Sequence, residues 1–153
     1  MRNRPGSFGA LIRGLVPAAV APALIGAAAQ PADVSARVTG LRSAKGQVLA
    51  CLTARATAFP DCAKDPAARA VSVPASAVVE IDFGEVPPGR YAISLFHDEN
   101  GNGRLDRRLL IPREGYGFSR DAPVHFGPPR FAEAAFAVDG GRQRQLIRMR
   151  YMF

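Results

Sequence analysis

Short segments in which apolar and polar residues alternate, separated by turn-forming residues, constrain this chain more than any other feature. Alternation with a period of two places successive side chains on opposite faces of a strand. The segments with this pattern are 34–40, 46–52, 77–83, 90–97, 134–138 and 144–153, with a weaker one at 68–73. No segment after residue 29 keeps a helical period, and ten prolines fall there. Because proline interrupts helices, an all-β fold is expected.

Strands that follow one another without helical crossovers indicate an antiparallel, Greek-key-like β-sandwich of about seven strands. Segments 34–40 and 46–52 flank a turn at Lys45–Gly46 and are expected to pair as a hairpin. The interval from about residue 98 to 130 is rich in Gly, Pro and Asn, and is expected to form one long ordered loop. The expected core residues are Val79, Ile81, Phe83, Tyr91, Ile93 and Leu95.

Residues 1–29 differ from the remainder of the chain. Arg2, Arg4 and Arg13 are their only charges, and an apolar stretch then ends in the pattern Ala27-x-Ala29. This combination is typical of a secretory signal peptide. The alternative is a membrane anchor, but the apolar run is shorter than the roughly 20 residues that a spanning helix needs. We expect cleavage near Ala29, a single domain over residues 30–153, and a periplasmic or secreted protein without a transmembrane span.

The charge balance of the chain is basic, with 20 Lys and Arg against 13 Asp and Glu. Loss of the three arginines before residue 30 leaves 17 against 13, a net charge of +4. These charges are spread along the chain, and an exported protein rarely meets nucleic acid. We therefore expect no nucleic-acid partner, and an envelope component of unknown identity as the partner.

The two cysteines, Cys51 and Cys62, are 11 positions apart. In an oxidising compartment such a pair usually forms a disulfide, and we expect this bond here. The alternative is a pair of free or metal-bound thiols, although the spacing does not match a zinc ribbon.

The stretch "HDENGNGRLD", residues 97–106, carries the densest run of oxygen-bearing side chains. Its residues occupy positions 1, 3, 5, 7 and 9 of an EF-hand-type calcium loop, with Gly103 at the sharp bend. Position 12 is Leu109, so Glu114 is expected to act in its place. The predicted Ca²⁺ ligands are Asp98, Asn100, Asn102, Arg104 (through its carbonyl), Asp106 and Glu114. Binding would be weak, with a Kd of about 10⁻⁴–10⁻³ M. The alternative is an Asx-rich turn that needs no metal.

The segment from Pro87 to Pro123 resembles the signature of a bacterial exported family catalogued as domain of unknown function 2141. Leu110 stands where relatives often carry glycine, and "GPPRFAEAAF" (127–136) resembles the block that follows. The matching residues are Gly89, Tyr91, Ala92, His97, Asp98, Glu99, Asn100, Asn102, Asp106, Ile111, Pro112, Glu114, Gly115, Gly117, Phe118 and Ser119. The resemblance implies a small exported β-sandwich, similar in outline to transthyretin-like or surface-protein B-type modules. It implies no activity.

Motifs of nucleophilic catalysis are scarce. Ser119 lies in "GFSR" and not in a G-x-S-x-G elbow, although His97, His125 and several aspartates are available. The expected function is therefore a non-catalytic structural or binding module of the cell envelope. The alternative is a hydrolase that acts on an envelope polymer or lipid, with its site in residues 97–130. Five arginines are expected to pair with the acids of this region: Arg107, Arg108, Arg113, Arg120 and Arg130. The alternative is that one face of this group meets an anionic ligand.

Overall fold

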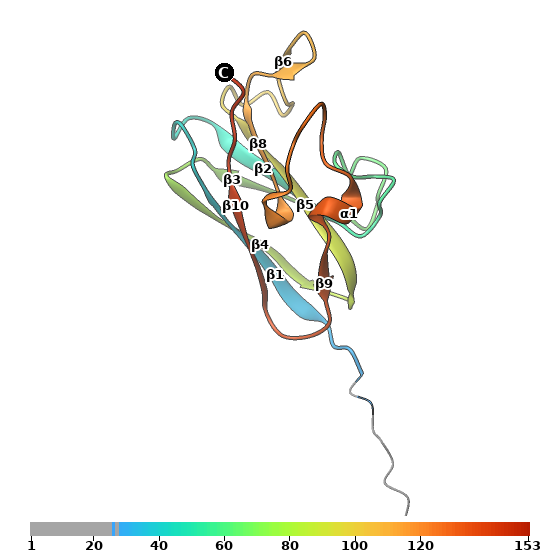
Figure 1. Cartoon of the computed structure of the whole chain (residues 1–153). Coiled ribbons are helices and arrows are strands. Elements are labelled where there is room, and N and C mark those ends of the chain that lie inside the picture. The colour runs from blue at the N-terminus through green and yellow to red at the C-terminus, as the bar shows by residue number, and fades with distance from the viewer. Residues whose placement is uncertain (1–25, 27) are drawn as a thin grey trace, which may run out of the picture.

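A computed structural model describes residue 26 and residues 28–153, so the predicted signal peptide lies almost entirely outside the described residues. The elements, in order, are β1 (Ala32–Thr39), β2 (Gln47–Thr53), β3 (Arg69–Pro74), β4 (Val78–Val86), β5 (Gly89–Asp98), β6 (Arg107–Arg108), β7 (Ile111–Pro112), β8 (Gly115–Phe118), the 3₁₀ turn η1 (Ser119–Asp121), α1 (Phe131–Ala134), β9 (Phe136–Val138) and β10 (Gln143–Arg148). Strands dominate (Figure 1), which confirms the predicted all-β fold. Within the described residues, no helix is long and apolar enough to cross a membrane.

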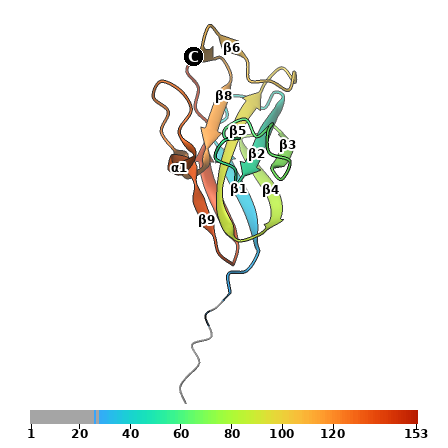
Figure 2. The same ribbon diagram turned by 90° about the vertical axis from the view of Figure 1, so that its right-hand side faces the viewer.

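The strands form two main sheets. One has the order β10-β1-β4, and the other has the order β3-β2-β5-β8. The short strand β9 pairs with the start of β5, on residues 89–91, whereas β8 pairs with residues 94–97 of the same strand. The interval expected to be one long loop therefore contains a small β6–β7 hairpin and a strand of the larger sheet. This hairpin lies at the end of the molecule that also holds Phe153 (Figures 1 and 2).

One apolar cluster joins the two main sheets. Val34, Val38 and Ile81 reach it from the three-stranded sheet, and Leu52 and Ile93 reach it from the other. The burial of alternate residues in β1 and β4 is the pattern that the sequence predicted. Burial of these side chains is the main favourable contribution to the stability of the fold.

Tyr91 was expected in this core, but it is only half-buried. Its hydroxyl donates a hydrogen bond to the carbonyl of Pro87, at 2.9 Å. A buried phenol needs a hydrogen-bond partner, and here the partner lies near the surface, at the start of β5. The side chain therefore packs against the edge of the core.

The predicted hairpin between β1 and β2 is wrong. β1 pairs with β4 and β10, and β2 pairs with β3 and β5. Val38 of β1 and Val48 of β2 are both fully buried in the same cluster. Two strands that bury their apolar faces against each other belong to opposite layers, and residues 40–46 are long enough to cross between the layers.

The expectation of a wholly antiparallel arrangement is also wrong, because β1 and β10 run parallel. β9 belongs to the larger sheet, and the chain then crosses to the smaller sheet through residues 139–142. The direction of β10 is therefore set by this crossing and not by a turn next to β1.

The last segment of the chain links the two sheets. The predicted strand over 144–153 ends at Arg148, where β1 also ends. The Met149 amide then donates to the carbonyl of Thr39 at 2.7 Å, and Arg150 exchanges two main-chain bonds of 2.9 Å with Tyr116 of β8. These bonds fasten the smaller sheet to the larger one beside the β6–β7 hairpin.

A second apolar cluster covers the outer face of the larger sheet. Tyr116 and Phe118 of β8 are buried in it, and Phe59, Phe96 and Phe131 pack against them. The predicted disulfide is present: Cys51 of β2 is bonded to Cys62 in the loop after that strand, with 6.5 Å between the Cα atoms. The bond ties this loop to the sheet, where it forms part of the outer face.

Replacement of Ile93 by alanine is expected to lower the free energy of unfolding by about 2–5 kcal/mol, because the fully buried side chain leaves a cavity between the sheets. Urea denaturation measures this change. Leu146→Ala is the control: Leu146 is 66% exposed on β10, and its loss should change stability by less than about 0.5 kcal/mol. Equal effects of the two substitutions would contradict the assignment of the core.

Candidate functional site

The stretch of residues 97–106 forms the end of β5 and the turn that leads to β6. Asp98 is fully buried, and its carboxylate accepts hydrogen bonds from the amides of Asn102 and Gly103, at 3.0 and 2.8 Å. The Gln47 side chain donates a third bond, at 3.1 Å. Burial raises the pKa of Asp98, but these hydrogen bonds outweigh it, and the net pKa lies below the usual value. Asp98 therefore holds the turn from the inside as a carboxylate.

Two asparagines complete the turn. The Asn100 side-chain oxygen accepts from the Asn102 amide at 3.1 Å, and the Asn102 oxygen accepts from the Arg104 amide at 2.8 Å. Their side-chain nitrogens donate to the two oxygens of Asp106, at 2.7 and 3.0 Å. These are the local bonds by which Asn and Asp stabilise turns.

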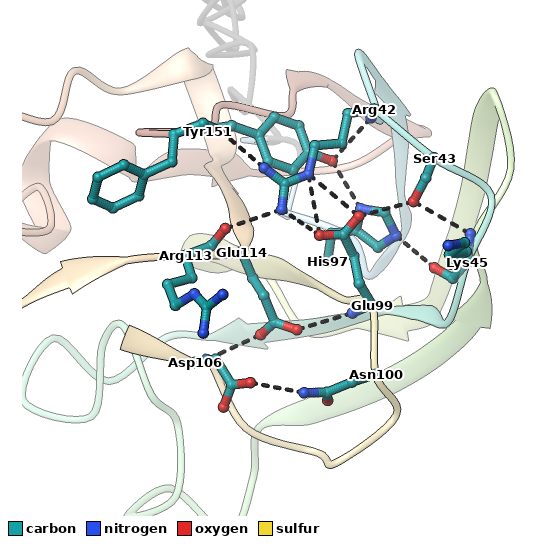
Figure 3. Close-up of polar contacts among 11 residues, drawn as sticks. Arg42, Ser43, Lys45, His97, Glu99, Asn100, Asp106, Arg113, Glu114 and Tyr151 are labelled. Carbon is teal, nitrogen blue, oxygen red and sulfur yellow. Dashed lines mark hydrogen bonds and ion pairs between the residues drawn. The ribbon is translucent and has the colours of Figure 1, made fainter. Parts of the chain in front are cut away.

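Glu114 closes the base of the turn. This residue is buried, and its two carboxylate oxygens accept from the amides of Glu99 and Asp106, at 3.0 and 2.9 Å (Figure 3). The carboxylate therefore joins the first and last parts of the turn. The next position, Gly115, requires glycine, because a Cβ atom there would lie 2.5 Å from the ring of Tyr151.

The six predicted Ca²⁺ ligands thus lie in or beside a single turn. Five of them offer carboxylate or amide oxygens as possible ligand atoms, and Arg104 would use its main-chain carbonyl. Within the described residues, no group of three or more His, Cys, Asp or Glu side chains is arranged to hold a metal ion. The carboxylates of Asp98 and Glu114 already accept hydrogen bonds from main-chain amides. Calcium binding therefore stays a prediction, and the turn also has a full set of bonds of its own.

Arg42 connects this turn to distant parts of the chain. Its guanidinium forms an ion pair with Glu99 and donates to the carbonyls of Arg113 and Phe153, at 3.1 and 2.9 Å. It also lies over the ring of Tyr151, 4.5 Å from the ring centre. The hydrogen bond from Arg42, with help from the hydroxyl of Ser43, holds the pKa of Glu99 below its usual value.

His97 is fully buried behind the ion pair. Its Nε2 lies 2.7 Å from the carbonyl of Lys45, and its Nδ1 lies 2.8 Å from the hydroxyl of Tyr151. Because a carbonyl only accepts, Nε2 carries the hydrogen of the first bond. Burial raises the pKa of Tyr151, so its hydroxyl keeps its proton at neutral pH. We call Arg42, His97, Glu99, Glu114 and Tyr151 the polar clamp (Figure 3).

Two of the residues considered for nucleophilic catalysis, Ser119 and His97, are buried and hydrogen-bonded inside the protein. Ser119 is fully buried: its hydroxyl donates to the carbonyl of Ala134 at 2.6 Å and accepts from the amide of Ile93 at 2.9 Å. Ser119 thereby provides a hydrogen-bond partner for the main chain of Ile93, in the part of β5 that pairs with neither β8 nor β9. Both ring nitrogens of His97 are hydrogen-bonded, Nδ1 to the Tyr151 hydroxyl and Nε2 to the Lys45 carbonyl.

An apolar groove of about 950 Å³ lies on the outer face of the larger sheet. Outward-facing residues of β2, β5 and β8 line it: Leu49, Cys51, Ser94, Phe96, Tyr116 and Phe118. The β6–β7 hairpin contributes Leu110 and Ile111, and the segment before α1 contributes Phe126. The turn held by the polar clamp leads directly into this hairpin, so the clamp positions one wall of the groove.

Two arginines also line the groove. Arg104 and Arg107 are exposed, and neither forms an ion pair with any other residue that the structure describes. The expected pairing of the five local arginines with the acids of the turn is therefore wrong for all five within the described residues. Glu99 pairs with Arg42, and Asp106 is held by asparagine amides. Of the five arginines, Arg130 alone forms an ion pair in the described part of the chain, and its partner is Glu133.

A family model described as "Uncharacterized protein conserved in bacteria (DUF2141)" matches residues 36–145 of the 153. The chain belongs to this family. No curated protein and no solved structure matches the chain. The DUF2141 match covers the polar turn and both sides of the groove, but it ends before Tyr151.

The signature found in the sequence contains only part of the site. It includes His97, Glu99 and Glu114, but not Arg42 or Tyr151, which lie 57 residues before and 54 residues after their partners. The apolar residue pattern could not reveal the groove either, because its lining comes from segments that are far apart in the sequence, between Leu49 and Met152.

Replacement of Glu114 by glutamine is expected to loosen the turn. The new amide group would point a donor at one of two main-chain N–H groups that now face a carboxylate, and loss of such a bond costs about 1.5–3 kcal/mol. Hydrogen exchange should become faster at the amides of Glu99 and Asp106, while the amides of β1 and β4 keep their protection relative to global unfolding. Unchanged exchange at both amides would contradict the role of Glu114.

Acid is expected to destabilise the protein through Glu99. A carboxylate whose pKa is lower in the folded state stabilises the fold above its unfolded pKa, and this contribution is lost as the pH falls through the folded pKa. The free energy of unfolding should therefore decrease below about pH 4.5, the ordinary value for a glutamate. Urea denaturation between pH 7 and pH 3 should show a weaker pH dependence for Glu99→Gln. The exposed Glu85→Gln control should behave like the wild type.

Proposed function

We propose that this member of the DUF2141 family is a non-catalytic binding module of the bacterial cell envelope, and that its ligand lies in the apolar groove. The observation that carries this proposal is the combination of a large apolar groove with a wall that is held by buried hydrogen bonds. Ligand sites are typically concave, mostly apolar and formed in advance, with a few polar groups at fixed positions.

The positions of the chemically reactive side chains support binding over catalysis. Ser119 and His97 are fully buried, and their polar atoms are hydrogen-bonded inside the protein. A catalytic nucleophile and its base need to reach one another and the substrate. Of the two histidines, His125 is the one that lines the groove, and the alternative hydrolase would depend on it.

Export to the envelope is supported by two features. The first is the basic and apolar character of residues 1–29, with its Ala27-x-Ala29 exit. The second is the disulfide between Cys51 and Cys62, a bond that persists in oxidising compartments. N-terminal sequencing of protein recovered from the periplasm or medium tests this part of the proposal: a start near Gln30 supports it, and a start at Met1 opposes it.

Binding in the groove can be tested with Nile red, an uncharged dye that fluoresces in apolar surroundings. Ala70 is exposed and lines the groove, so Ala70→Trp should occupy part of it and reduce the fluorescence gain. Ala137→Trp is the matched control, because Ala137 is exposed on β9 and does not line the groove. Wild type and control should bind alike. Absence of binding to the wild type would overturn the proposal.

The same preparations should be assayed on generic esters and on envelope glycans. The expected result is no turnover above that of heat-denatured protein. Turnover by the wild type that is lost in His125→Gln would support the hydrolase instead.

Calcium is expected to bind weakly at the turn and to raise the melting temperature slightly. At fivefold Kd, a ligand adds about 1 kcal/mol to stability. Melts with millimolar Ca²⁺ and with EGTA measure the effect. Asp106→Asn should reduce it, because one carboxylate is lost, whereas Asp139→Asn at an exposed site should not. If calcium leaves the wild-type melt unchanged and calorimetry shows no heat, the stretch is only a turn.

A further inference from the structure

We infer that the ligand of the groove is a long-chain carboxylate: a single-chain amphiphile whose apolar tail lies along the larger sheet and whose head contacts Arg104 and Arg107. This inference rests on the proposed function and names the class of ligand for the same site. Two observations carry it, namely the apolar lining of the groove and the charge at its hairpin end.

The apolar lining of the groove favours a ligand with an apolar tail. Phe96, Tyr116 and Phe118 contribute aromatic surface from the sheet, and Leu110 and Ile111 contribute aliphatic surface from the hairpin. Leu110 is 89% exposed, and Phe126, which also lines the groove, is fully exposed. Exposed apolar side chains that face one groove gain free energy when an apolar ligand covers them.

The volume of the groove is sufficient for a single alkyl chain. A groove of about 950 Å³ lies at the upper end of the range for sites that hold drug-sized ligands. A single alkyl chain with a small head is smaller than this volume and fits within it.

The charge favours an anionic head. Arg104 and Arg107 lie at the hairpin end and have no acidic partner among the described residues. The nearest acid in sequence, Asp106, is held by the amides of Asn100 and Asn102. Asp61 also lines the groove, but it belongs to the loop after β2. Guanidinium groups bind carboxylates through paired hydrogen bonds.

A second copy of the chain fits this surface less well. Arg104 and Arg107 line the groove, so two copies that joined through this face would bring four such arginines together. Like charges opposite one another oppose association. A dimer through the groove is therefore an outcome that the test has to exclude.

Titration calorimetry with dodecanoate, below its micelle concentration, tests the inference. Dodecanol and dodecyltrimethylammonium are the matched neutral and cationic ligands. We expect dodecanoate to bind about threefold more tightly than dodecanol, as exposed charge pairs contribute modestly, and the preference should decrease with added salt. The cationic ligand should bind more weakly than either.

Two pairs of adjacent residues supply matched variants. Arg107 lines the groove and Arg108 does not, so Arg107→Gln should remove most of the preference for dodecanoate and Arg108→Gln should keep it. Leu110 lines the groove and Leu109 does not, although they are 89% and 91% exposed. Leu110→Ala should weaken binding of both dodecanoate and dodecanol about fivefold, and Leu109→Ala should leave it unchanged.

Binding in the groove and the preference for a carboxylate are tested by different results. If Nile red binds the wild type but dodecanoate and dodecanol bind equally, the groove is a binding site and the carboxylate assignment is wrong. Preferential binding to phosphatidylglycerol vesicles over dodecanoate would also overturn it, in favour of a membrane surface. A dimer by analytical ultracentrifugation that Ala70→Trp disrupts would assign the groove to a second copy of the chain.

Discussion

The buried carboxylate of Glu114 is the contact on which the candidate site depends most. It accepts hydrogen bonds from the amides of Glu99 and Asp106. These two main-chain groups would otherwise lie unpaired at the base of the turn. Burial of an unpaired polar group is costly, so this single side chain decides whether the turn can pack against the sheet. The hairpin and its part of the groove project from that base, and Arg42 then fastens the turn to residues on both sides of it.

The fold could be predicted from the sequence as far as local patterns determine it. Alternation in β1 and β4 shows which residues are buried, and the spacing of Cys51 and Cys62 allows the disulfide. The pairing of strands is not local. β1 and β2 are neighbours in sequence and both amphipathic, yet they face each other across the core. The alternation of residues is the same whether two strands share a sheet or face one another, so the pattern cannot separate these cases.

The candidate site could be predicted only in part, for a related reason. The polar turn stands out because its Asp and Asn residues are consecutive, and the structure brings Asp98, Asn100, Asn102 and Asp106 together as expected. An oxygen-rich stretch does not reveal whether its oxygens face a cation or main-chain amides. Arg42 and Tyr151 carry no local signal, because each is defined by a partner more than fifty residues away.

The parallel pairing of β1 with β10 has a consequence for the route by which the protein folds. Val34 is paired with Gln143 and Thr39 with Arg148, so nearly the whole chain lies between partners that become neighbours. Contacts of such wide separation require closure of a long loop before they return any free energy, and proteins rich in them fold slowly. Until β10 arrives, one edge of β1 presents free N–H and C=O groups. Folding intermediates of this protein are therefore exposed to intermolecular strand pairing at this edge.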